Sequence, residues 1–117
     1  GGHGDAVKAL LADTGEVNAT MHNGTTALML AANGGHGEMT AALLAAKADV
    51  NAARPDGMTA LMATAQRGHA EVVAALLAAK ADVNARNEEG DTALALALRG
   101  RRQRVVAVLK AAGAKEP

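Results

Sequence analysis

One stretch of twelve residues occurs twice in this chain without a change, and it constrains the fold more than any other feature. The sequence AALLAAKADVNA runs from Ala41 to Ala52 and again from Ala74 to Ala85. The two copies are 33 residues apart, and looser copies lie one period to either side. Self-similarity at a fixed period of this length is the signature of stacked structural units. The sequence therefore predicts a repeat protein.

Each unit carries the signals of two helices and a turn. In the second unit, Asn23-Gly24 marks a turn, and Thr25-Thr26 supply hydroxyls that can cap a helix beginning near Ala27. We expect that helix to end at Gly34-Gly35 and a second helix to run from about Glu38 to Ala46. The third unit repeats this plan.

The period divides the chain into one domain of four units. We assign a partial repeat to residues 1–22, full repeats to 23–55 and 56–88, and a C-terminal capping repeat to 89–117. Because Gly1-Gly2-His3 aligns with residues 34–36, we expect the chain to begin within a repeat, and the sequence leaves open whether it is part of a larger protein. In the last unit, Lys110 replaces a leucine and Arg101-Arg102 replace Gly68-His69, as the polar outer face of a cap requires.

Composition limits the core and the partners. Half of the residues are apolar, yet none is Phe, Tyr or Trp, so the core must consist of Ala, Leu, Val and Met. Twelve basic and twelve acidic residues cancel, so net charge favours neither nucleic acid nor membrane. Cysteine is absent, and neither a signal segment nor a membrane-spanning apolar run is visible. We expect a soluble, cytoplasmic chain.

The periodic polar residues are poor candidates for chemistry. Three histidines recur at the repeat period: His3, His36 and His69. Neighbouring units lie roughly 10 Å apart, which is too far for these side chains to share a metal ion. Three acids recur in the same way, as expected of the first turn of a helix: Asp5, Glu38 and Glu71. Without Ser or Cys nucleophiles or a phosphate-binding loop, we expect no enzyme activity, cofactor or metal.

The repeated motifs resemble those of a known family. Gly-x-Thr-Ala-Leu-Met, Gly-His-x-Glu and Ala-Asp-Val-Asn-Ala recur in register every 33 residues, and together they resemble the ankyrin repeat over nearly the whole chain. The resemblance implies an all-α solenoid of stacked antiparallel helix pairs, with β-hairpin-like fingers at one edge. It also implies a protein–protein interaction module whose concave face, formed by fingers and first helices, binds a protein or a neighbouring domain of the parent chain.

The chain departs from the family pattern at two kinds of position. Where the family usually has Thr-Pro-Leu-His, the second unit has Thr26-Ala27-Leu28-Met29, so the hydrogen bonds of that histidine are lost. Lys47 and Lys80 stand where the family usually has Gly after the second helix. A left-handed backbone there would strain each lysine by about 1 kcal/mol, partly offset by placing a cation at a helix C-terminus.

Residues that differ between units at otherwise periodic positions are the candidate binding surface, because the scaffold does not dictate them. On the fingers these are His22, Asn23, Thr25, Pro55, Asp56, Met58, Glu88, Glu89 and Asp91, and on the ends of the first helices they are Asn33, Gln66, Arg67 and Arg99. We expect this face to change from neutral on its N-terminal side to acidic at the C-terminal fingertips. Without Tyr or Trp anchors, affinity must depend on Arg and Met.

Two alternatives remain at this point. The array could be a structural spacer or a self-associating scaffold, although we expect a monomer in isolation. The densest charge cluster could instead bind an anionic surface or nucleic acid, and it comprises Arg99, Arg101, Arg102 and Arg104. Aromatic residues for base stacking are absent from the sequence. A terminal capping unit also needs charged residues to remain soluble, so the arginines do not require a nucleic-acid partner to explain them. No small-molecule substrate or membrane partner is expected.

Overall fold

The computed structural model describes residue 20 and residues 24–114. In this part of the chain the structure contains six helices, which follow one another as three pairs. The first helices of the pairs are α2 (Ala27–Asn33), α4 (Ala60–Arg67) and α6 (Ala93–Arg99). The second helices are α3 (Gly37–Ala45), α5 (Ala70–Ala78) and α7 (Gln103–Ala111).

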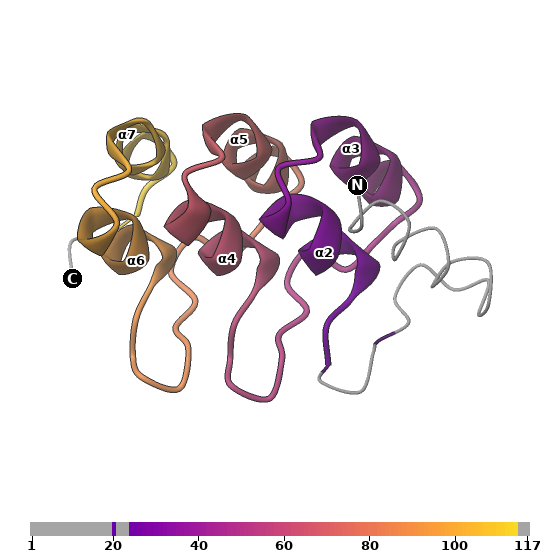
Figure 1. The fold of residues 1–117 in the computed structure, drawn as a ribbon, viewed down its shortest axis with the longest axis horizontal. Helices are drawn as coiled ribbons and strands as arrows, with labels where there is room; N and C mark the ends of the chain where they lie inside the picture. The colour runs from indigo at the N-terminus through magenta and orange to yellow at the C-terminus, as the bar shows by residue number, and fades with distance from the viewer. Residues whose placement is uncertain (1–19, 21–23, 115–117) are drawn as a thin grey trace.

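The helices form two parallel rows. Figure 1 shows α2, α4 and α6 side by side in one row and α3, α5 and α7 in the other, with the long loops before α4 and α6 projecting beyond the first-helix row. The molecule measures 40 × 26 × 23 Å along its principal axes, so the stack is elongated. The first helices contact one another more extensively than the second helices do. This arrangement confirms the predicted all-α solenoid.

A threonine begins each first helix. The Thr59 hydroxyl accepts a hydrogen bond from the Met62 main-chain nitrogen at 3.3 Å, and the Thr92 hydroxyl accepts one from Ala95 at 3.2 Å. Thr26 does the same for Met29 at 3.2 Å, and its own main-chain nitrogen donates to the Met29 sulfur at 3.5 Å. These contacts satisfy donors that a helix leaves unpaired at its N-terminus. The predicted threonine caps are confirmed.

The turn after each second helix contains one residue with a left-handed backbone. Lys47 has φ 72°, Lys80 has φ 74°, and Gly113 has φ 94° at the equivalent position of the last unit. Such values cost little for glycine but strain a residue with a Cβ atom. The structure therefore confirms that both lysines occupy a backbone conformation suited to glycine.

The loops before α4 and α6 have the form of fingers, and the two described ends of the loop before α2 are paired in the same way. Antiparallel bridges join Thr20 to Thr26 in the first finger (residues 20–26) and Ala53 to Thr59 in the second finger (53–59). In the third finger (86–92), the Asn87 main-chain nitrogen donates to the Asp91 oxygen at 3.0 Å. Within the described residues these pairings are isolated and form no strand. The predicted hairpin-like character is confirmed.

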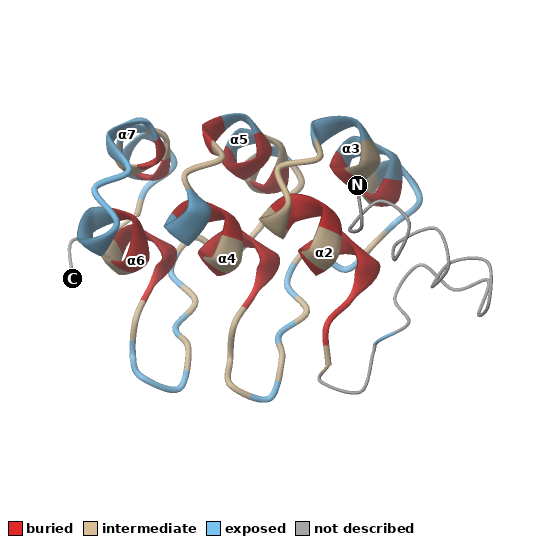
Figure 2. Cartoon of the chain, in the orientation of Figure 1, coloured by how far each residue is buried: buried red, intermediate tan, exposed pale blue. Residues whose placement is uncertain are grey.

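The core lies between the two rows of helices and consists of small aliphatic side chains. Figure 2 shows the buried residues concentrated on the facing sides of the rows, while the tips of the second and third fingers are intermediate or exposed. Leu28, Leu61 and Leu94, one period apart, are at most 2% exposed. Two buried threonines satisfy their hydroxyls locally, since Thr40 donates to the His36 oxygen at 2.8 Å and Thr64 to the Ala60 oxygen at 2.6 Å.

The repeated twelve residues serve the stacking of the units. The side-chain oxygen of Asn51 accepts a hydrogen bond from the main-chain nitrogen of Asp82 at 2.7 Å. Its amide nitrogen donates to the main-chain oxygen of Lys80 at 3.3 Å. One asparagine therefore holds the turn of the following unit in place. This contact explains physically why the stretch can recur without change.

A second contact between units links a first helix to the start of the next second helix. The Nε2 atom of His69 lies 3.2 Å from the main-chain oxygen of Asn33, and the His69 ring covers Gly35. One unit later, the Nε atom of Arg102 donates to the oxygen of Gln66 at 3.1 Å. Arg102 therefore takes over the role of His69. Arg102 is also exposed, so this contact adds to its predicted place on the polar face of the last unit.

Candidate binding surface

The fingers and the first helices enclose two adjoining hollows. The N-terminal hollow, of about 330 Å³, lies between the first two fingers and helices α2 and α4. The C-terminal hollow, of about 300 Å³, lies between the second and third fingers and helices α4 and α6. Three residues, Arg54, Met58 and Gln66, line both hollows. The hollows therefore form one continuous surface on the finger side of the stack.

Most of the predicted binding residues lie on this surface. The structure places ten of them on the walls of the two hollows: Thr25, Asn33, Asp56, Met58, Gln66, Arg67, Glu88, Glu89, Asp91 and Arg99. Pro55 is exposed at the tip of the second finger and lines neither hollow. His22 and Asn23 lie outside the described residues. Whether these side chains contact a partner stays a prediction.

Thr25 differs from the other predicted residues because it is buried. Only 7% of Thr25 is exposed, so it contributes little area to the wall of the N-terminal hollow. It lies just before the capping residue Thr26, where the chain enters helix α2. The helix start therefore determines its environment, and the expectation that it is an accessible finger residue is wrong.

Several residues of the surface were missed by the sequence analysis. These are Met29, Leu30, Arg54, Thr59, Ala63, Asn87 and Leu96. Arg54 and Asn87 occupy equivalent positions of successive units and differ in type, so the criterion that selected the other candidates could have found them. Leu30 and Leu96 have ordinary core residue types at helical spacing. Only the packing shows that they reach the surface of a hollow.

Charged side chains on the fingers form two ion pairs. Arg54 lies 3.0 Å from the carboxylate of Asp56 within the second finger, and Arg99 on α6 pairs with Asp91 on the third finger. The hydrogen bond from the Met58 main-chain nitrogen lowers the pKa of Asp56, and the Arg54 charge acts in the same direction. The bond to Asp91 raises the pKa of the Arg99 guanidinium. These four charges are therefore largely compensated within the protein.

The remaining charges make the two hollows electrostatically different. In the C-terminal hollow, the carboxylates of Glu88 and Glu89 form no ion pair with any described residue. The N-terminal hollow contains Arg54 and Arg67 and, among the described residues, no acidic side chain. The expected acidic character of the C-terminal fingertips agrees with this geometry. The described N-terminal part is cationic rather than neutral, because Arg67 lines it without an ion pair among the described residues, whereas Arg54 is paired with Asp56.

Local hydrogen bonds hold the shape of the fingers. In the second finger, Asp56 accepts the Met58 main-chain hydrogen bond at 3.0 Å. In the third finger, the Asn87 side-chain oxygen accepts from the main-chain nitrogens of Glu89 and Asp91, both at 3.0 Å. The Glu88 main-chain nitrogen also donates to the main-chain oxygen of Asp56 at 2.9 Å, and this hydrogen bond joins the two fingers. The walls of the C-terminal hollow are therefore preorganised.

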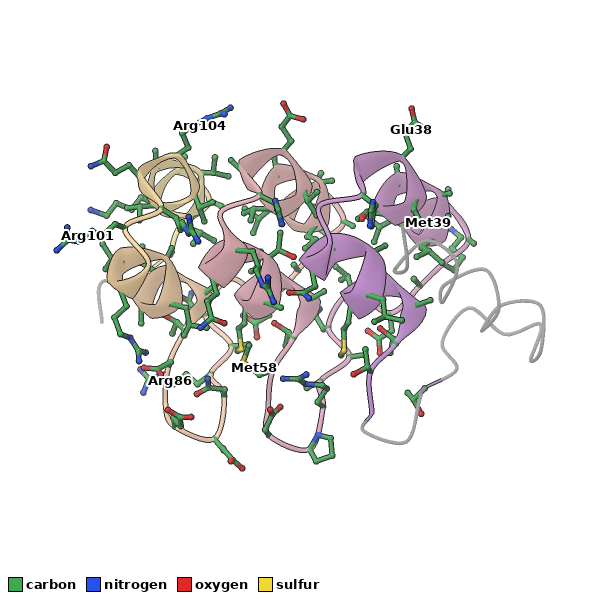
Figure 3. All side chains as sticks on the ribbon, in the orientation of Figure 1. Glu38, Met39, Met58, Arg86, Arg101 and Arg104 are labelled. Atoms are coloured by element: carbon green, nitrogen blue, oxygen red, sulfur yellow. The ribbon has the colours of Figure 1, made fainter. Side chains whose placement is uncertain are left out.

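The structure divides the four clustered arginines among different environments. Arg99 pairs with Asp91 beside the C-terminal hollow, and Arg102 bonds to Gln66 between the units. Arg101 and Arg104 are exposed and point away from the stack at separate places near α7 (Figure 3). The four side chains do not converge on one anion-binding point.

The described part of the chain contains neither the side-chain grouping of a metal site nor the helix of a membrane span. No group of three His, Asp or Glu side chains there lies close enough together to hold a metal ion. Among the same residues, no helix has the length and apolar character needed to cross a membrane.

Comparison with family models shows a similarity over nearly the whole chain. A model described as ankyrin repeats, in three copies, matches residues 1–87 and again residues 38–116. The two matches overlap and together cover nearly the entire chain. No curated protein matches the sequence.

Proposed function

The chain belongs to the ankyrin-repeat family, and from this premise we propose that its concave face, formed by the fingers and the first helices, binds a protein partner. Ankyrin repeats are generally protein–protein interaction modules and are typically not enzymes. The partner in this proposal is a separate protein or a neighbouring domain of the parent chain. We propose no cofactor and no reaction, and a cytoplasmic location stays a prediction.

One observation supports the concave face above all others. The residues that vary between units gather on two adjoining hollows, although they come from three fingers and three helices. Apart from the buried Thr25, these positions are intermediate or exposed, and stacking does not require particular residue types there, so their variety is available for recognition. The chemistry of the surface favours a partner of modest affinity. It offers Met58 and Arg67 as anchors but contains no aromatic side chain.

A capture experiment with paired variants tests the proposal. The full chain is immobilised beside a concave-face variant, Met58→Ala with Gln66→Ala and Arg67→Ala, and proteins retained from an extract of the source organism are compared. The control is an outer-face variant, Glu71→Ala with Gln103→Ala and Arg104→Ala, whose residues are exposed on α5 and α7. We expect the wild type and the control to retain the same protein and the concave-face variant to lose it.

Three other results would contradict the proposal. Retention by the concave-face variant but not by the control would place binding on the outer face. A solution mass above the monomer, removed by neither variant, would favour self-association through the ends of the stack. Salt-sensitive binding of a polyanion that requires Arg101 and Arg104 would favour the anionic-surface alternative.

A further inference from the structure

We propose that the two hollows together bind a single polypeptide segment that presents an acidic side chain to the N-terminal hollow and a basic side chain to the C-terminal hollow, with an apolar side chain between them. This inference rests on the proposed function, because it specifies the partner of the same face. Its basis is the opposite charge of two hollows that share a boundary.

The basic position follows from the third finger. Of the four carboxylates that line the C-terminal hollow, those of Asp56 and Asp91 are already paired with arginines. The carboxylates of Glu88 and Glu89 have no ion pair among the described residues, and both residues are exposed. Of the two, only Glu89 acts electrostatically on Arg99 of the same hollow, and Arg99 is already paired with Asp91. Arg86, at the start of the same finger, is not among the residues that line the hollow. A lysine or arginine of the partner would supply the missing counter-charge.

The acidic position follows from the end of helix α4. Arg67 is exposed, lines the N-terminal hollow and forms no ion pair with any described residue. The other guanidinium of this hollow, that of Arg54, is already engaged by Asp56. No described carboxylate lines the N-terminal hollow to compensate Arg67. A carboxylate of the partner would therefore gain a bidentate contact at this position.

The apolar position follows from the boundary between the hollows. Met58 lines both of them, and Figure 3 shows it near the base of the fingers, below the row of first helices. Its sulfur lies 3.6 Å from the side-chain nitrogen of Asn87, a contact that joins it to the third finger. Leu30 adds half-buried apolar surface on one side. A flexible thioether beside leucine suits an aliphatic or aromatic side chain.

Selection from a random twelve-residue peptide library tests the inference. The library is displayed on phage and selected in parallel against four forms of the full chain. These are the wild type, Glu88→Lys with Glu89→Lys, Arg67→Glu, and a control with the same charge change as the first variant, Glu38→Lys with Glu71→Lys. Both control positions are exposed on second helices, remote from the lining of either hollow.

We expect the wild type and the control to enrich peptides that combine an acidic and a basic residue around an apolar one. The Glu88, Glu89 variant should lose the preference for the basic residue alone, and Arg67→Glu should lose the preference for the acidic residue alone. A synthetic peptide of the enriched type should bind the Glu88, Glu89 variant and the Arg67→Glu variant at least about fivefold more weakly than the wild type, and should bind the control as tightly as the wild type.

The failures of the two proposals are distinguishable. Peptides that the Met58, Gln66 and Arg67 alanine variant fails to bind, but that show no charge pattern, would overturn this inference and leave concave-face binding intact. The inference would also be overturned if the Glu88, Glu89 variant and the Arg67→Glu variant both enriched peptides with the same charge pattern as the wild type. Enriched peptides that bind the concave-face alanine variant as well as the wild type, or an absence of enrichment, would count against both proposals.

Discussion

The Nε atom of Arg102 donates a hydrogen bond to the main-chain oxygen of Gln66, 3.1 Å away, across the boundary between two repeats. His69 makes the equivalent contact with Asn33 one unit earlier, at 3.2 Å. Two chemically different side chains therefore perform one structural task. The shared requirement is a nitrogen donor on a side chain long enough to reach the preceding first helix.

Removing this contact should weaken the stack. We expect Arg102→Ala to lower the free energy of unfolding by about 1 kcal/mol, since a side-chain donor to a main-chain oxygen is lost. The melting temperature should fall by about 4 °C. Arg102→His should retain most of the stability, because histidine makes this contact at position 69. The matched control is Arg104→Ala, an exposed residue of the same helix, and a loss equal to that of Arg102→Ala would contradict the assignment.

A methyl group at Gly35 should disturb the other contact of this type. A Cβ atom there would lie 2.9 Å from the Cε1 and Nδ1 atoms of the His69 ring, and the backbone has φ +74°. Gly35→Ala should therefore cost about 2–3 kcal/mol, from backbone strain and from displacement of the ring. Gly90→Ala is the control, because Gly90 has φ +84° with open space around its Cβ position. Gly90→Ala should lower the free energy of unfolding only by the backbone strain, about 1 kcal/mol. Equal losses for the two variants in urea unfolding would contradict the steric argument.

Replacing the two left-handed lysines with glycine should stabilise the protein. Lys47 and Lys80 have φ 72° and 74°, and Gly113 already occupies the equivalent place in the last unit. The double variant Lys47→Gly, Lys80→Gly should raise the melting temperature, because relief of up to about 1 kcal/mol at each site exceeds the lost cation at a helix end. The alanine pair Lys47→Ala, Lys80→Ala removes the charges but keeps the Cβ atoms, so it should give no gain. An unchanged or lower melting temperature for the glycine pair would refute the strain argument.

The second finger should make stability depend on pH in the acid range. The pKa of Asp56 is lowered from 3.8 by the hydrogen bond from the Met58 nitrogen and by Arg54. A lowered pKa in the folded state stabilises the protein above the unfolded pKa, and this contribution is lost as pH falls through the folded value. Asp56→Asn retains an oxygen for the Met58 bond but does not ionise. Its unfolding free energy should therefore fall less than that of the wild type between about pH 5 and pH 2. Parallel curves for the two proteins would show that Asp56 does not contribute.

Much of the scaffold was predictable because its causes are local. The threonines 26, 59 and 92 cap helices that begin one residue later, and the glycine-like turns at Lys47 and Lys80 follow from the register of the repeat. The residues of the binding surface were also mostly predictable, since a position that varies within a strict period is free of stacking constraints. The same criterion would have found Arg54, had it been applied to every finger position.

The sequence by itself determined the period, the helix pairs, their caps and the positions at which the units differ, because each of these depends on residues close together in the chain. Only the tertiary structure decided which distant side chains meet. It paired Asp91 of the third finger with Arg99 of α6, it buried Thr25, and it turned Arg102 toward Gln66. Those outcomes depend on side-chain reach and on the close approach of neighbouring units, which spacing alone does not specify. The repeated twelve residues therefore determine the stack. The residues around the hollows, which differ between units, are brought together into a charge pattern only once the stack has formed.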